Sequence, residues 1–180
     1  LPDGETLIDK LHAARIPTLG LGKVASIFAY RGFSDVDEEG KGSNPELFAR
    51  LLSAVEDPKY QRGLLFANLV HFDQSWGHKR RPEAFYRGLR DVDAMLPMLF
   101  ERLKPTDLLF ITADHGNDPT YVGSDHTREY VPLLVYNPVI AGNASVIDKD
   151  LLNLGIRSTE ADTGQTIAEA LLGNECLTHG

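Results

Sequence analysis

Apolar residues recur along the chain in two alternating patterns, one typical of helices and one typical of buried strands. In the first residues, helical spacing places Leu7, Leu11 and Ala14 on one face of a helix predicted over residues 5–15. Elsewhere, short continuous apolar runs have the length of buried strands. These runs are residues 16–21, 64–70, 108–112 and 131–136.

Further helices are predicted by capping residues and by longer apolar stripes. Asn44 and Pro45 form a strong helix start, with Asn44 as the N-cap and Pro45 in the first turn. A long helix is predicted over residues 82–103, with a kink at Pro97 because proline cannot donate the internal hydrogen bond. A closing helix is predicted over residues 161–172.

The alternation of helices and buried strands predicts an α/β fold with a mostly parallel sheet covered by helices. The chain contains neither repeats nor an obvious linker, so residues 1–180 are expected to form one domain. In open α/β sheets, ligands bind beyond the carboxyl ends of the strands. The residues that directly follow the predicted strands are therefore the first place to search for chemistry.

Composition and charge limit which kinds of molecule the chain is expected to bind and where it is expected to work. The net charge of −8 is spread along the chain, and such a surface repels nucleic acid and anionic lipid, so neither is expected to bind. No apolar run has transmembrane length, which argues against a membrane protein. Cys176 is the single cysteine, so disulfides are not expected, and a reducing cytoplasm fits.

Three short segments contain four of the six histidines, each near a carboxylate. They are residues 71–78 and 112–118, which both follow a predicted strand, and residues 124–129, which precede one. A lone Asp-His pair is more often a chance or capping pair, and Arg128 with Glu129 fits a plain surface ion pair. Three such segments together favour a metal site, because carboxylate and imidazole are good ligands for Mn²⁺ and Zn²⁺.

The same segments resemble the phosphopentomutase family of the alkaline phosphatase superfamily. Residues 111–119, Ile-Thr-Ala-Asp-His-Gly-Asn-Asp-Pro, and residues 125–134, Asp-His-Thr-Arg-Glu-Tyr-Val-Pro-Leu-Leu, are similar to the family signature almost letter for letter. Residues 68–73, with His78 five positions further on, resemble its other metal segment. The resemblance extends over about residues 3–172. Phosphoglycerate mutases share the Asp-His-Gly-Asn core but not the continuation from Asp125.

The resemblance implies roles for individual residues. Asp73, His78 and His126 would hold one Mn²⁺ ion. Asp114 and His115 would hold a second Mn²⁺ ion, together with an aspartate upstream of this chain. The implied fold is an alkaline phosphatase-like three-layer α/β/α core without its N-terminal strand and cap domain. The missing N-terminal half, which carries the threonine nucleophile, would be the partner of this chain.

The implied reaction interconverts ribose 1-phosphate, or 2-deoxyribose 1-phosphate, and the corresponding 5-phosphate in nucleotide salvage. Lys23 matches a lysine that contacts the substrate phosphate, although an ordinary solvated lysine is an equally good interpretation. A sugar bisphosphate is the expected activator. Because the nucleophile lies elsewhere, the isolated chain is expected to be inactive.

Two other functions remain open from the sequence. One is a related metal-dependent phosphoglycerate mutase or phosphohydrolase, which substrate assays would distinguish. The other is a non-catalytic metal-binding or interaction domain, which would bind Mn²⁺ without turnover.

Overall fold

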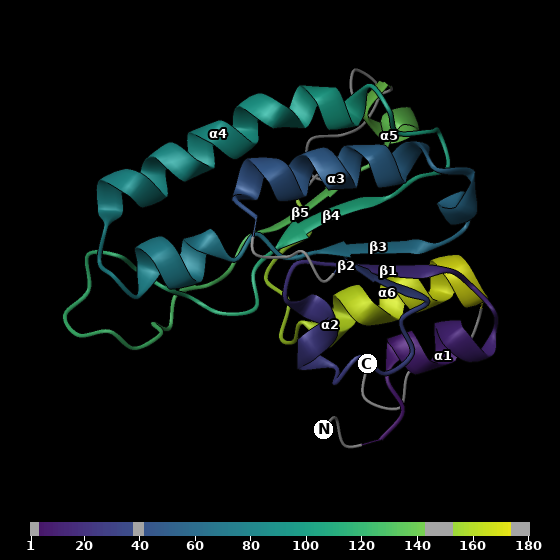
Figure 1. Cartoon of the computed structure of the whole chain (residues 1–180), viewed down its shortest axis with the longest axis horizontal. Coiled ribbons are helices and arrows are strands. Elements are labelled where there is room, and N and C mark those ends of the chain that lie inside the picture. Colours follow the sequence, from purple (N-terminus) through teal and green to yellow (C-terminus); the bar gives the residue numbers. More distant parts are fainter. Residues whose placement is uncertain (1–3, 38–41, 143–152, 174–180) are drawn as a thin grey trace.

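Two short sheets form the centre of the fold (Figure 1). The first contains three parallel strands in the order β2-β1-β3, and the second pairs β4 and β5 in antiparallel fashion. The strands are β1 (Thr18–Leu21), β2 (Asp35–Asp37), β3 (Leu64–Ala67), β4 (Leu109–Thr112) and β5 (Leu133–Tyr136). The structure is a computed structural model that describes residues 4–37, 42–142 and 153–173.

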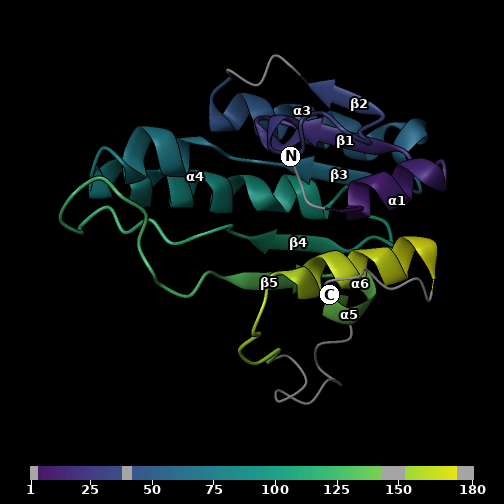
Figure 2. The same cartoon turned by 90° about the horizontal axis from the view of Figure 1, so that it is seen from below.

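Helices cover both faces of the strands, which gives three layers (Figures 1 and 2). One face is covered by α3 (Asn44–Glu56) and α4 (Pro82–Phe100), and α3 contacts β3. The other face is covered by α1 (Leu7–Ala13), α2 (Val24–Ile27) and α6 (Ala161–Leu172), and both α1 and α2 contact β1. Short elements complete the described part, namely η1 (Pro58–Tyr60), the π-helix η2 (Phe72–Gly77) and α5 (Pro138–Gly142).

The predicted α/β class with a mostly parallel sheet is confirmed. The core lies between β1 and α3, where Leu19, Leu21 and Leu47 are buried against one another. None of the described helices is long and apolar enough to cross a membrane. Cys176, on which the expectation of a disulfide-free chain rests, lies outside the described residues.

The strands differ from the prediction in two respects. The run at 131–136 forms an antiparallel strand, and the described strands divide into two sheets instead of one. In addition, β4 and β5 are not fully buried, since Leu134 is 58% and Val135 is 42% exposed. Among the described strands, β4 and β5 pair only with each other.

Helix starts also differ in detail from the prediction. Ser43, not Asn44, is the N-cap of α3, and its backbone N–H donates to Glu46 Oε2 at 2.6 Å. Asn44 is buried in the first turn, where its Oδ1 accepts from the His71 N–H. The long helix α4 continues through Pro97 to Phe100, and α6 has the predicted bounds.

Candidate metal centre

The segments that carry the predicted metal ligands lie beyond the carboxyl ends of β3 and β4 (Figure 1). After β3 the chain enters η2, which carries Asp73 in its first turn and is followed by His78. After β4 come Asp114 and His115, and His126 lies in the loop that leads to β5. Three separate segments therefore converge at the edge of an α/β fold where ligands are expected.

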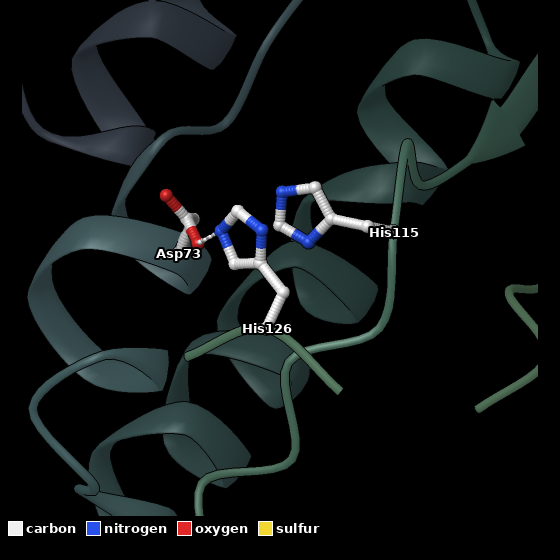
Figure 3. A group of neighbouring side chains, drawn as sticks. All are labelled: Asp73, His115 and His126. Carbon is white, nitrogen blue, oxygen red and sulfur yellow. Dashed lines mark ion pairs between the residues drawn. The ribbon is translucent and has the colours of Figure 1, made fainter. Parts of the chain in front are cut away.

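Four of these side chains form a cluster, which we call the His/Asp cluster: Asp73, His78, His115 and His126. Asp73 Oδ1 lies 3.2 Å from His78 Nε2 and 3.4 Å from His126 Nε2, and the two Nε2 atoms are 3.1 Å apart. The rings of His115 and His126 stack with centroids 3.6 Å apart. Figure 3 shows Asp73, His115 and His126, whose ligand atoms all lie within 4.8 Å of one another.

Backbone carbonyls fix the orientation of two imidazoles. The Nδ1 atom of His78 contacts the Ser124 carbonyl, and Nδ1 of His115 lies 3.1 Å from the Gly116 carbonyl. A carbonyl only accepts, so each Nδ1 must carry the hydrogen, and each neutral ring presents a bare lone pair at Nε2. For His78 that lone pair faces the Asp73 carboxylate, an arrangement of two acceptors that requires a proton or a cation between them.

The spacing fits a metal ion. Ligand atoms about 2.1 Å from one ion stand about 3.0–3.4 Å apart in octahedral or tetrahedral geometry. The three distances among Asp73 Oδ1, His78 Nε2 and His126 Nε2 are 3.1–3.4 Å. Metal-binding histidines generally donate their other N–H to a carbonyl or carboxylate, as His78 does here. The donor set and its spacing are therefore ones that could hold a divalent ion.

Two predicted site residues lie outside this cluster. The Asp114 side chain is 69% exposed, and its Oδ2 lies 3.7 Å from Nε2 of the neighbouring His115. Lys23 follows the carboxyl end of β1, at the start of α2, with an exposed side chain. The preceding residue, Gly22, packs closely against the segment after β3, because a Cβ on Gly22 would lie 2.7 Å from the Asn68 carbonyl oxygen.

Three further residues near the site were not identified from the sequence. Asn117 donates from Nδ2 to Asp73 Oδ1 at 2.7 Å. Its place in the Asp-His-Gly-Asn run is the sequence feature that could have identified it. Arg80 donates hydrogen bonds to the segment around Asn117, and no sequence pattern predicts these bonds. The pKa of Glu160 is raised, first because its carboxyl group is partly desolvated and then by the charge of the Asp114 carboxylate.

Comparisons with known proteins identify relatives of this chain. The profile of the Metalloenzyme superfamily matches residues 14–172. The chain is 41% identical over 168 residues to a phosphopentomutase of Anaeromyxobacter sp. (strain K) and 43% identical over 168 residues to one of Caldanaerobacter subterraneus subsp. tengcongensis. A phosphopentomutase of Alkaliphilus oremlandii is 36% identical over 170 residues.

These alignments cover nearly all of this chain but a minor part of the relatives. They include 93–94% of the chain, whereas the chain spans 40% of the length of each of the three relatives. The resemblance in the metal segments thus extends to almost every element of the fold, and the superfamily profile includes the whole His/Asp cluster. The chain belongs to the Metalloenzyme superfamily, whose core is alkaline phosphatase-like.

Proposed function

We propose that this chain is the metal-binding part of a phosphopentomutase, the enzyme that interconverts ribose 1-phosphate or 2-deoxyribose 1-phosphate and the 5-phosphate in nucleotide salvage. The observation that carries the proposal is the ligand triangle of Asp73, His78 and His126 in a chain 36–43% identical to phosphopentomutases. Residues 1–180 would form the C-terminal part of the metal-binding, alkaline phosphatase-like core domain of the enzyme. The single cysteine favours a cytoplasmic location.

The proposed ligands divide into two sets, one for each ion. Asp73, His78 and His126 hold one Mn²⁺, and Asp114 and His115 hold a second together with a carboxylate from outside this chain. The two bound ions would neutralise charge on the phosphoryl group during its transfer. Because His115 already stacks on His126, the two sites would lie side by side.

The substrate and the nucleophile complete the proposal. Lys23, at the carboxyl end of β1, would contact the phosphate of the pentose, and a sugar bisphosphate would prime the enzyme. The threonine that accepts the phosphoryl group would belong to the part of the enzyme outside this chain. Thr127 is a poor substitute because its side chain is buried and its Oγ1 accepts from the Asp118 N–H at 2.7 Å.

The proposed partner is the remaining part of a phosphopentomutase, and the strands offer a place for it. In β3, the backbone groups of Leu64 and Asn68 point toward β1, so those of Leu65 and Ala67 point to the opposite edge. Among the described strands, none pairs with that edge. An added strand there would use these groups and cover apolar surface.

The test is an assay of ribose 1-phosphate conversion to ribose 5-phosphate with Mn²⁺, run beside Mn²⁺ titration calorimetry. The chain alone should bind Mn²⁺ without turnover, since loss of a nucleophile lowers kcat by about 10⁶ in well-studied covalent enzymes. Addition of the N-terminal part of a phosphopentomutase should restore turnover, and the same addition to an Asp73→Asn chain should not. Activity on phosphoglycerate or simple phosphate esters would instead support a related mutase or phosphohydrolase. Mn²⁺ binding with no turnover after complementation would support a non-catalytic domain.

A further inference from the structure

Arg80 makes more side-chain hydrogen bonds than its position just after the metal segment would lead one to expect. Its guanidinium donates from all three nitrogens, and every acceptor but one belongs to the loop of residues 117–126, which we call the 117–126 loop. The acceptors are the carbonyls of Gly77, Asp118, Gly123 and Asp125 and the Oδ1 atom of Asn117.

Two of these bonds hold the part of the 117–126 loop that touches the His/Asp cluster. Arg80 Nε donates to the Gly123 carbonyl, and Nη2 donates to the Asp125 carbonyl at 2.6 Å. The carbonyl between them, that of Ser124, is the one that orients His78. The next residue after Asp125 is His126, so Arg80 holds the backbone directly before a proposed metal ligand.

A third bond connects Arg80 to Asp73 through one intermediate. Arg80 Nη1 donates to Asn117 Oδ1 at 2.9 Å, and Asn117 Nδ2 donates to Asp73 Oδ1 at 2.7 Å. Because a guanidinium only donates, it forces the amide oxygen of Asn117 toward itself and the amide N–H toward the carboxylate. Asp73 Oδ1 is the same atom that faces His78 and His126.

The backbone around Arg80 is adapted to this arrangement. Arg80 has a φ of 49°, a left-handed conformation that is unfavourable for a residue other than glycine. Gly77 allows the Asn117 side chain to come close, since a Cβ there would lie 2.5 Å from the Asn117 side-chain amide. A local conformation this unfavourable persists where other contacts hold it. Here those contacts are the hydrogen bonds of the guanidinium to five acceptors, of which the three at Nη1 share its two hydrogens.

We propose that Arg80 is a positioning residue that preorganises the metal ligands by holding Asp73 through Asn117 and His126 through the 117–126 loop. The inference rests on the proposed metal site but concerns a residue outside the ligand set. Its rigid fork of five N–H donors can reach acceptors on both sides at once. A lysine keeps the charge and loses the fork, so Arg80→Lys should retain only part of the effect.

The first experiment measures Mn²⁺ affinity by titration calorimetry and the visible absorption spectrum of the Co²⁺-loaded full chain. Loss of a group that orients metal ligands typically lowers affinity about 10–100-fold. We therefore expect Arg80→Gln to weaken Mn²⁺ binding by at least about tenfold and to change the Co²⁺ spectrum, with Arg80→Lys between it and the wild type. The matched control is Lys79→Gln, which removes the same charge from the exposed neighbouring residue. Equal effects of Arg80→Gln and Lys79→Gln would overturn the proposal.

The second experiment needs no metal and separates this inference from the proposed function. Thr127 N–H donates to the Gly116 carbonyl, and Asp118 N–H donates to Thr127 Oγ1. Amide hydrogen exchange at these two positions should accelerate in Arg80→Gln and not in Lys79→Gln. If the wild type binds no Mn²⁺, the proposed function fails, whereas unchanged exchange in Arg80→Gln overturns the role of Arg80. Should Arg80→Gln fail to fold, Arg80→Lys and Asn117→Ala are measured in the same way, and wild-type affinity and exchange in both would also overturn it.

Discussion

The Trp76 ring packs directly on the backbone of Gly88, so closely that a Cβ on Gly88 would lie 2.1 Å from the ring. Trp76 belongs to η2, and Gly88 is a buried residue of α4. Edge-to-face contacts from Trp76 to Phe72 at 5.1 Å and from Phe72 to Phe85 at 5.2 Å continue the same interface. The helix that carries Asp73 is therefore held against α4 by aromatic packing that depends on one glycine.

We expect Gly88→Ala to destabilise the protein because the new methyl group overlaps the Trp76 ring. Overpacking of this kind costs about 1–3 kcal/mol in the free energy of unfolding, measured here by urea denaturation. Gly142→Ala is the control, since a Cβ there meets no atom within 4 Å. In a Trp76→Leu background the cost of Gly88→Ala should shrink, and an unchanged cost would show that the ring is not the obstacle.

A second prediction concerns the ion pair between α1 and the segment after α2. The side-chain hydrogen bond from Arg31, at 2.5–2.8 Å, is the main cause that lowers the pKa of Asp9 to about 2. A carboxyl group whose pKa is lower in the folded state stabilises the protein above its unfolded pKa, near 3.8, and loses that contribution as the pH falls toward 2. The stability of the wild type should therefore decline between about pH 4 and pH 2.

Asp9→Asn isolates this contribution. At pH 6 it should lower the free energy of unfolding by about 1 kcal/mol, because solvent screens a pair in which the Arg31 side chain is 42% exposed. Near pH 2 the difference from the wild type should nearly vanish. Asp91→Asn, at an exposed position of α4, controls for the loss of one charge. A difference that stays constant from pH 6 to pH 2 would contradict the assignment to Asp9 ionisation.

The sequence predicted those parts of the fold that depend on local patterns. The closing helix α6 has the predicted bounds because its apolar stripe and Gly173, with a φ of 81°, define it locally. The strand β2 was missed because two of its three residues are aspartates and it carries no apolar run. The direction of β5 was also missed, since apolar patterning marks a strand but not its orientation.

The site was predictable to a similar extent. The order of residues after the strands, with the family resemblance, led to Asp73, His78 and His126, and the structure brings these three together. The sequence did not show that the His115 ring stacks on His126, because these two residues are not neighbours in the chain. It only showed that His115 follows Asp114. The contacts of Arg80 with residues 117–125 depend on the path of a loop about 40 positions away, which no local pattern describes.

A third prediction separates substrate binding from metal binding. Lys23→Ala should leave Mn²⁺ affinity unchanged, because Lys23 lies at the end of β1 and outside the His/Asp cluster. In protein complemented with the rest of a phosphopentomutase, the same change should raise KM for ribose 1-phosphate about tenfold or more, through loss of a charged hydrogen bond of about 1.5–3 kcal/mol. Lys79→Ala is the control, and an equal KM in both variants would make Lys23 an ordinary solvated lysine.

The last prediction tests the ligand triangle itself. Asp73→Ala and His126→Ala each remove one of the atoms that face one another at 3.1–3.4 Å, so each should lower Mn²⁺ affinity by at least about tenfold in titration calorimetry. The control is His12→Ala, which removes an exposed imidazole from α1 at no cost to the cluster. Metal should also raise the midpoint of thermal unfolding in the wild type. This shift should be smaller in both ligand variants, since the stabilisation by an ion that binds only the folded state grows with the logarithm of its affinity. Unchanged Mn²⁺ affinity in Asp73→Ala would remove that carboxylate from the site. The contact between His78 Nε2 and Asp73 Oδ1 would then have to be explained by a shared proton, and in that case the stability of the metal-free protein, not its metal content, should respond to Asp73→Ala.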